Sequence, residues 1–194
     1  MNKNDYKETK YNQPLILQRA DPYVYKSKEG TYYFTASVPA YDKVVLRSAD
    51  TVKGLTEAEE RTLWVKHEEG PQSIHIWAPE IHRVGDNWVV YFTESQNSRS
   101  LFGIYCHALV LPGDQDPYET ALKASNEASQ WKDYQMRGGT GLTNAIVNSF
   151  CLDMTYFKDE VNGESYVIWA STAYGNSSLY MAKVNEEKPY ELTS

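Results

Sequence analysis

Tyr33-Phe34-Thr35-Ala36-Ser37 decides the fold, because the pattern returns as Tyr91-Phe92-Thr93-Glu94-Ser95 and, more weakly, as Val167-Ile168-Trp169-Ala170-Ser171. A short apolar strand precedes each copy, and the turn between the two is rich in the Asp, Asn and Gly residues of tight hairpins. Another β-type run follows each copy. The chain is therefore predicted to repeat one antiparallel unit of three or four strands.

Repeated antiparallel units of this kind are typical of β-propeller blades. We predict an all-β chain that belongs to the five-bladed β-propellers and holds about three blades, while a β-sandwich of unequal hairpins is the alternative. The blades are expected at about residues 12–66, 74–111 and 145–194. Outside the blade strands we expect a helical turn at 56–61, a polar loop at 112–132 with one helix at 118–128, and a Gly-rich loop at 137–141.

The composition narrows both the fold and the partners. The 194 residues suit one domain, and 16 Tyr, 5 Trp and 5 Phe favour strands over a helical bundle. The net charge of −7 and the isoelectric point near 5.1 exclude nucleic acid and anionic membranes as partners, because an acidic chain is not attracted to polyanions. A neutral glycan remains possible.

Location and cofactors are predicted from what the sequence lacks. No run of 18 apolar residues indicates a transmembrane helix, and residues 1–10 lack the apolar core of a signal peptide. We therefore expect a cytoplasmic location, while export by another route stays open. Cys106 and Cys151 are too few for a disulfide framework and are predicted to be small core residues. The sequence has no metal-binding or cofactor-binding motif, and we expect the protein to need neither a metal nor a cofactor.

Two acids begin corresponding strands. Asp21 opens the first strand of the first unit, and Asp153 holds the corresponding place in the third. First strands line the central channel of a propeller, so the two carboxylates are expected to converge. One could deprotonate water while another, with a raised pKa, protonates a leaving oxygen, as glycoside hydrolysis requires. An Asp before Pro is also a common turn former, and that reading stays open.

The second unit adds aromatic candidates. Trp77 precedes Glu80, an acid expected at the channel, and an indole is a surface on which a sugar ring stacks. A core position for Trp77 is equally compatible with the pattern. His75 could bond a sugar hydroxyl or cap a loop.

The residues resemble one known family. Arg19-Ala20-Asp21-Pro22-Tyr23-Val24-Tyr25, followed by Tyr32-Tyr33-Phe34-Thr35-Ala36-Ser37, resembles the opening blade of glycoside hydrolase family 43. Trp77-Ala78-Pro79-Glu80 with Trp88-Val89-Val90-Tyr91-Phe92 resembles its second blade, and Phe150-Cys151-Leu152-Asp153 its third. The similarity extends over roughly residues 12–194 and is greatest to the arabinofuranosidase branch.

The resemblance implies a five-bladed propeller that removes terminal α-L-arabinofuranosyl residues from arabinan or arabinoxylan-type glycans with inversion. It implies that Asp21 is the general base and that Asp153 orients the general acid and raises its pKa. Trp77, His75 and Phe34 would form walls of the arabinose subsite.

The general acid of the family is a Glu of the fourth blade, usually in a Glu-Gly-Pro setting. None of the Glu residues after Asp153 has this setting; they are Glu160, Glu164, Glu186, Glu187 and Glu191. Glu69-Gly70-Pro71 precedes the second blade and is interpreted as a coincidence. Because three units fill the chain, we expect it to be the N-terminal portion of a longer enzyme. This portion would lack the general acid.

Alternatives remain open at this stage. A β-xylosidase or an endo-arabinanase would share the two acids and differ in the loops. A non-catalytic sugar-binding module, or an inactive remnant, would account for the missing acid and the retained aromatic residues.

Overall fold

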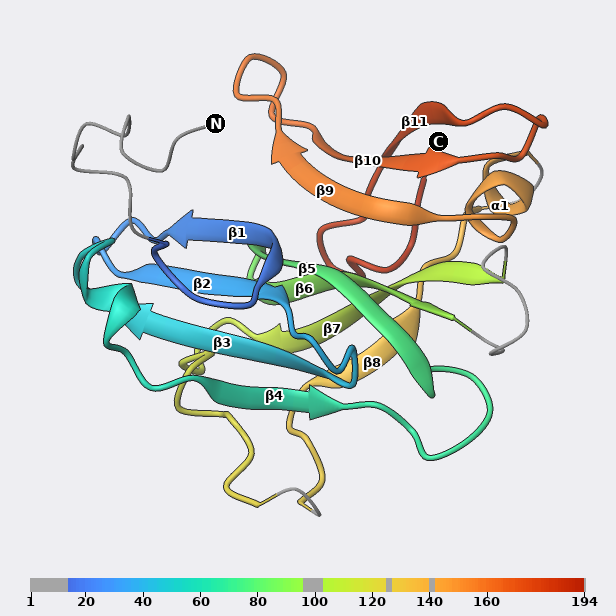
Figure 1. The fold of residues 1–194 in the computed structure, drawn as a ribbon. Helices are drawn as coiled ribbons and strands as arrows, with labels where there is room; N and C mark the ends of the chain where they lie inside the picture. The colour runs from blue at the N-terminus through green and yellow to red at the C-terminus, as the bar shows by residue number, and fades with distance from the viewer. Residues whose placement is uncertain (1–13, 96–102, 125–126, 140–141, 194) are drawn as a thin grey trace, which may run out of the picture.

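The fold comes from a computed structural model that describes residues 14–95, 103–124, 127–139 and 142–193. The described chain forms three antiparallel sheets (Figure 1). The first sheet has the order β1 (Ala20–Lys26), β2 (Tyr32–Ser37), β3 (Lys43–Ala49) and β4 (Arg61–Val65). The second has the order β5 (Ile74–Val84), β6 (Asn87–Ser95), β7 (Ile104–Pro112) and β8 (Lys132–Gln135). The third consists of β9 (Leu152–Lys158), β10 (Ser165–Ser171) and β11 (Ser178–Lys183).

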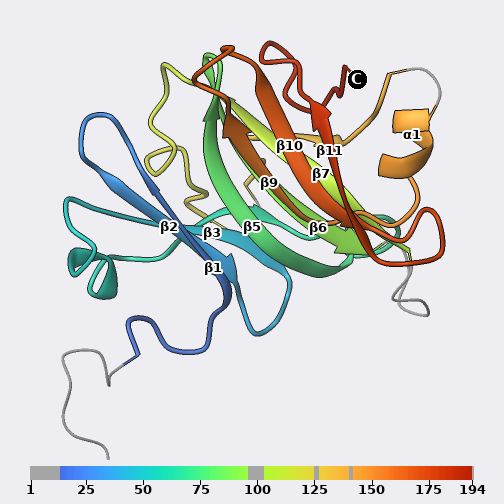
Figure 2. The same cartoon turned by 90° about the horizontal axis from the view of Figure 1, so that it is seen from above.

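Each sheet is a meander in which strands that follow one another in sequence are hydrogen-bonded neighbours. The three copies of the repeated pattern fall on β2, β6 and β10, the second strand of each sheet. The first strand of the second sheet, β5, contacts β1 on one side and β9 on the other. Figure 2 shows the sheets following one another around these first strands. The predicted all-β fold with about three propeller blades is confirmed.

Two hydrophobic clusters fill the spaces between neighbouring sheets. The first joins Leu46 and Leu63 of the first sheet to Ile81 and Phe92 of the second. The second cluster joins the second and third sheets; among its members are Tyr91, Met154, Val167 and Trp169, together with the two cysteines. Cys106 and Cys151 are buried and free, as predicted for small core residues.

The segment between β7 and β8 differs from the prediction. The helix expected at residues 118–128 does not form in its described part, which consists of turns and bends. The Asp116 carboxylate accepts the backbone N–H groups of Tyr118 and Glu119 at 2.8 and 2.9 Å, which closes a turn instead of a helix. The Leu122 N–H donates to the Thr62 carbonyl at 2.8 Å and draws the segment along β4. Tertiary contacts therefore override the local helical tendency.

Three short elements also differ. A fourth strand, β8, completes the second sheet and lies outside the residues 74–111 expected for that blade. The helical turn expected at 56–61 is replaced by the earlier 3-10 turn η1 (Gly54–Thr56). The unexpected helix α1 (Leu142–Val147) follows the Gly-rich segment 137–141, of which residues 140–141 lie outside the described ranges. Gly138 lies so close to this helix that a Cβ atom there would be 2.3 Å from the Asn144 nitrogen.

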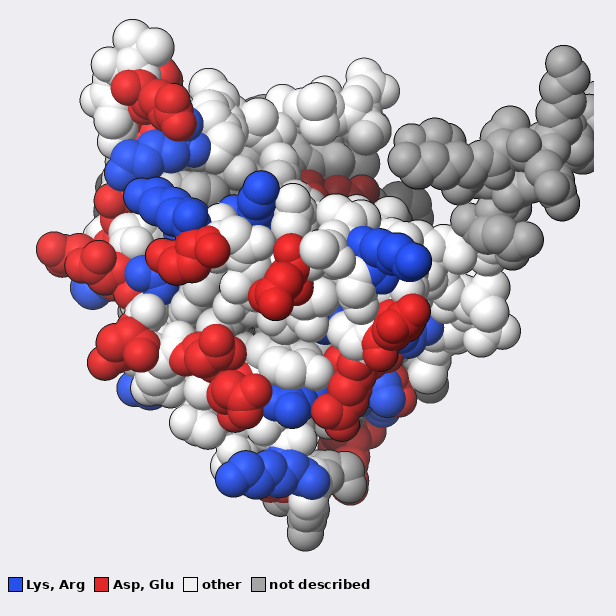
Figure 3. Space-filling view, turned by 90° about the vertical axis from the view of Figure 1, so that its left-hand side faces the viewer, with Lys and Arg blue, Asp and Glu red and all other residues white. Residues whose placement is uncertain are grey.

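Figure 3 views the end of the blades where the hairpins β1–β2, β5–β6 and β9–β10 turn. Acidic and basic side chains are interspersed over this face, with uncharged surface between them.

Candidate functional site

The first strand of each sheet has a residue in the left-handed backbone region at a break in its pairing with the second strand. These residues are Asp21, Ala78 and Asp153, with φ values of 50°, 44° and 53°. The strand pairing is interrupted around each of them, so each lies in a bulge. Left-handed backbone at a residue other than glycine costs about 1–3 kcal/mol and clusters at functional sites, and bulges re-aim side chains there. Asp21 and Asp153 thus occupy equivalent positions in the first and third blades, and Ala78 occupies that position in the second.

Asp21 is exposed, and its carboxylate is held from the neighbouring strand. The Ser37 hydroxyl donates to Asp21 Oδ2 at 2.8 Å and accepts the Ala78 N–H at the same distance. Because the Ala78 N–H occupies a lone pair of the hydroxyl oxygen, the hydroxyl proton is directed at the carboxylate. Ser37 is buried, so this bridge is rigid. It joins the bulges of the first two blades and leaves Asp21 Oδ1 as a further acceptor.

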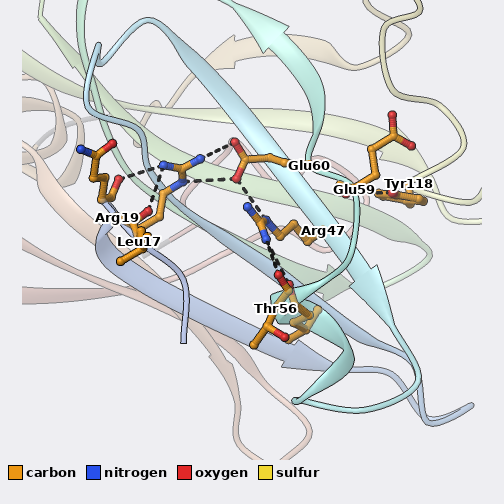
Figure 4. A network of polar contacts seen from close by, with 9 residues as sticks. Leu17, Arg19, Arg47, Thr56, Glu59, Glu60 and Tyr118 are labelled. Atoms are coloured by element: carbon orange, nitrogen blue, oxygen red, sulfur yellow. Dashed lines mark hydrogen bonds and ion pairs between the residues drawn. The ribbon is translucent and has the colours of Figure 1, made fainter. Parts of the chain in front are cut away.

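An ion-pair network fixes the chain just before Asp21 (Figure 4). Arg19 contacts both carboxylate oxygens of Glu60, at 2.5 and 3.2 Å. Arg47 of β3 bonds the same carboxylate at 3.3 Å and the Leu55 carbonyl at 3.2 Å. The arginines and the glutamate are each less than one-fifth exposed. The entry to β1 is thereby tied to β3 and to the segment between η1 and β4.

Asp153 titrates in the neighbourhood of two other acids. Burial raises the pKa of the Asp153 carboxyl, and the charges of Asp21 and Glu80 raise it further. One acid from each blade therefore contributes to a single electrostatic group. A raised pKa from nearby like charges is typical of acids that act together at an active site.

Glu80 belongs to a row of polar groups that crosses all three blades. Its carboxylate lies 3.0 Å from His82 Nε2, and His82 Nδ1 lies 3.1 Å from the Tyr23 hydroxyl of β1. The ring of Tyr156, on β9, meets His82 edge-on at 5.5 Å. Burial lowers the pKa of His82 and, with the Glu80 charge, raises the pKa of Tyr23 to about 12. A neutral His82 can then donate to Glu80 and accept from Tyr23.

Trp77 and His75 form one aromatic unit next to Ala78. Their rings stack with centroids 4.6 Å apart, and Tyr41 meets Trp77 edge-on at 5.8 Å. Both side chains are partly exposed. The buried Trp77 Nε1 and His75 Nδ1 atoms have no hydrogen-bond partner. Most buried polar atoms in proteins are hydrogen-bonded, so these two nitrogens remain available to a partner.

Phe34 does not join this unit. Its side chain is 3% exposed and packs with Ala36 and Leu55 in a cluster inside the first blade. The prediction that Phe34 forms a wall of a sugar subsite is therefore wrong, because a ring covered by η1 presents no face to a sugar. The prediction came from the resemblance to the family, and the burial of residues 33–37 along β2 could not be foreseen from it.

The late glutamates are engaged elsewhere. Glu164 pairs with Lys183, Glu186 with Lys158, and Glu191 with Arg137. The hydrogen bonds from these cations lower the pKa of each carboxyl, the opposite of what a general acid needs. Glu160 and Glu187 are exposed, as is Glu69 before β5. Within the described ranges, no group of three or more His, Cys, Asp or Glu side chains could hold a metal ion.

Sequence reasoning did not assign Ser37, His82 or Tyr23 to the site. The signal for Ser37 was available, since it is the last residue of the repeated pattern that ends in Ser37, Ser95 and Ser171. His82 and Tyr23 gave no signal, because their role depends on how neighbouring blades meet.

Comparison with known proteins identifies the family. The model of the glycosyl hydrolases family 43 matches residues 11–190. The chain belongs to this family. Its members in the comparison share the arrangement of sheets, and the chain represents about three blades of their five-bladed β-propeller.

Several family 43 proteins are closely similar to this chain. It is 38% identical over 177 residues to the extracellular exo-α-(1→5)-L-arabinofuranosidase of Streptomyces avermitilis, covering 90% of this chain and 33% of that protein. The corresponding protein of Streptomyces chartreusis is 33% identical over 186 residues, with 94% and 50% covered. The crystal structure of an α-L-arabinofuranosidase from Lactobacillus brevis superposes with a TM-score of 0.70 at 34% identity, over 93% of this chain and 53% of that one. The chain thus spans a third to a half of these relatives.

The two Streptomyces relatives are both named extracellular, whereas the sequence of this chain led to the expectation of a cytoplasmic location. In the part of the chain that the structure describes, no helix is long and apolar enough to cross a membrane.

Proposed function

We propose that this chain supplies the general base and the arabinose-binding wall of an α-L-arabinofuranosidase that removes terminal α-L-arabinofuranosyl residues from arabinan or arabinoxylan-type glycans with inversion. The observation that carries the proposal is the Asp21 carboxylate, exposed in a strained bulge and held by Ser37. Membership of family 43 and the arabinofuranosidases among its relatives support the choice of substrate.

In this mechanism Asp21 acts on water. Ser37 holds one carboxylate oxygen and leaves the other to accept a proton from a water molecule, which attacks the anomeric carbon from the face opposite the leaving group. Attack from that face inverts the anomeric configuration. The rigid bridge to Ala78 keeps the carboxylate in place through the reaction.

Asp153 has a supporting role in the proposal. Its carboxyl lies in the field of Asp21 and Glu80, and it would orient the general acid and raise the pKa of that acid by its own charge. Of the late glutamates, those paired with lysine or arginine are poor candidates for the general acid, so the proposal assigns this role to none of them.

Trp77 and His75 would bind the sugar. Trp77 directly precedes Ala78 on β5. The Ala78 N–H donates to Ser37, the serine that holds Asp21. The stacked rings give an apolar surface for the arabinose, and their unpaired nitrogens are available to its hydroxyl groups after small ring movements or through water.

The experiment is hydrolysis of an aryl α-L-arabinofuranoside followed by time-resolved proton NMR. The proposal expects release of arabinose, with β-L-arabinofuranose as the first anomer. An aryl β-D-xyloside and linear arabinan test the related β-xylosidase and endo-arabinanase activities. Retention of configuration, or turnover of the xyloside alone, would contradict the proposal.

A non-catalytic sugar-binding module is the second candidate, favoured by the ion pairs that engage Glu164, Glu186 and Glu191. Calorimetry with arabino-oligosaccharides separates the two. Binding without turnover supports the module, whereas turnover with inversion rejects it.

A further inference from the structure

A cluster of four polar side chains lies inside the second blade, and the proposed mechanism does not use it. Glu94 on β6 and His107 on β7 form an ion pair of 3.3 Å between Oε1 and Nε2. Asp133 on β8 lies 3.0 Å from His107 Nδ1, on the other side of the ring. Gln72, from the segment before β5, donates its side-chain N–H to Asp133. Glu94 is completely buried, and His107 and Gln72 nearly so.

The two carboxylates on either side of His107 favour an imidazolium there. Burial alone lowers the pKa of this histidine, but the hydrogen bonds and charges of Asp133 and Glu94 outweigh burial and raise it. The protonated ring can donate its Nδ1–H to Asp133 and forms an ion pair with Glu94 at Nε2. The side-chain nitrogen of Gln72 lies 2.8 Å from the same Nδ1 atom. The ring of Phe92 covers it at 5.6 Å, so the charged group is shielded from water.

The cluster holds the backbone of Gln72. Glu94 Oε2 accepts the Gln72 N–H at 2.8 Å, and the Gln72 carbonyl accepts the His67 N–H at 2.9 Å. Gln72 is in the left-handed region with φ 62°, a conformation that a residue other than glycine keeps only when its surroundings impose it. The bonds of Gln72 therefore fix the direction in which the chain enters β5.

The proposed arabinose-binding wall, formed by His75 and Trp77, follows Gln72 in the sequence. His75 and Trp77 lie within the first residues of β5, three and five positions after Gln72, and His75 also has positive φ, at 55°. The Ile76 N–H between them donates to the Tyr41 carbonyl at 3.1 Å. The wall is thus held from the first blade at Ile76 and from the interior of the second blade at Gln72.

We propose that Glu94, His107 and Asp133 are positioning residues that hold Gln72 and thereby set the place of His75 and Trp77 beside Asp21. When His107 loses its proton, its ion pair with Glu94 is lost, and the two facing carboxylates repel each other without a cation between them. Gln72 is then less firmly held, and the wall shifts with it. The proposal rests on the proposed function in that the wall is taken to bind sugar.

The first test needs no substrate and uses the unaltered chain. Histidine and indole nitrogen signals are followed by ¹H–¹⁵N NMR across the titration of His107, with the Trp77 indole assigned from Trp77→Phe. The proposal expects the Trp77 signal to move with the midpoint of His107. A Trp77 signal that stays constant while His107 titrates would overturn it.

Variants sharpen this test. Asp133→Asn keeps a hydrogen-bond acceptor but removes a charge, so the midpoint of both signals should fall together to lower pH. His107→Gln should abolish the Trp77 transition, whereas His67→Gln, which alters an exposed histidine of the same segment, should preserve it. A Trp77 transition that survives in His107→Gln contradicts the proposal, and if that variant does not fold, Asp133→Asn decides.

The second test uses an arabino-oligosaccharide. KM should rise several-fold over the pH range in which His107 deprotonates, and Asp133→Asn should move this rise to lower pH while kcat at lower pH is kept. If no arabinofuranoside is hydrolysed at all, the proposed function fails, and the NMR titration still decides the positioning role. A KM that is independent of pH, in an active enzyme, argues against positioning.

Discussion

At the scale of single residues, the site is built from strained backbone at repeated positions. Asp21 and Asp153 each lie in a bulge of their own strand and have positive φ. Ala78 lies in the corresponding bulge of the second blade, where no acid is present. Ala78 has no polar side chain, but its N–H donates to the Ser37 hydroxyl, which in turn donates to Asp21. The second blade thus contributes its backbone where the first and third contribute carboxylates.

The coupling of the two acids can be measured directly. We expect Asp21→Asn to lower the pKa of Asp153, because a like charge is removed, while burial and Glu80 still hold that pKa above the usual value. Carboxyl ¹³C NMR gives the titration. Asp86→Asn, which alters the β5–β6 hairpin at the other end of the blade, serves as the control. An Asp153 pKa that is the same in Asp21→Asn and in the unaltered protein would contradict the coupling.

The second prediction at this scale concerns Ser37, for which Ser171 of the third blade serves as a matched control. Ser37→Ala removes a bond to a carboxylate and leaves the Ala78 N–H unpaired, so we expect a loss of about 1–3 kcal/mol in the free energy of unfolding, together with a lower kcat. Ser171→Ala alters the equivalent buried serine of β10, which bonds Ser149 and the Ala173 N–H. Urea unfolding and kcat are compared. Equal kcat values for the two variants would count against the bridge to Asp21.

At the scale of elements, the strands could be predicted and the connections could not. The repeated pattern located β2, β6 and β10, because alternation and turn residues are local signals. The short polar strand β8 has no such signal and exists because β7 offers it a partner. The helix expected at 118–128 failed since Asp116 and β4 hold that segment. Phe34 was misplaced because a resemblance in sequence does not reveal that η1 covers this ring.

Packing between the first two blades gives a prediction for elements. Leu46 on β3 is completely buried in the cluster that joins these sheets, so Leu46→Ala should lower the free energy of unfolding by about 2–5 kcal/mol. Val161→Ala alters an aliphatic side chain that is 96% exposed in the β9–β10 hairpin, and should change it by less than about 0.5 kcal/mol. Urea unfolding measures both. Similar losses in the two variants would mean that this cluster does not hold the blades together.

At the scale of the whole molecule, two buried histidines oppose each other in pH dependence. His107 has a raised pKa in the folded chain, so its contribution to stability is complete at low pH and is lost as pH rises through that value. His82 has a lowered pKa, so the folded state disfavours its protonation and stability is lost as pH falls below the unfolded value of about 6.5.

These two histidines predict a stability profile with a fall on each side. Urea unfolding as a function of pH should show a fall in stability at the high-pH side in the unaltered protein and a flatter high-pH side in His107→Gln. A fall of the same size at the high-pH side of both proteins would rule out His107 as its cause.

The central claim is that Asp21 is the general base of an arabinofuranosidase. The most direct measurement is kcat on an aryl α-L-arabinofuranoside for Asp21→Asn, with Asp86→Asn as the control for loss of one acidic charge. The account predicts that kcat falls by about 10²–10⁴-fold in Asp21→Asn and is unchanged in the control. Full turnover by a folded Asp21→Asn protein would contradict it.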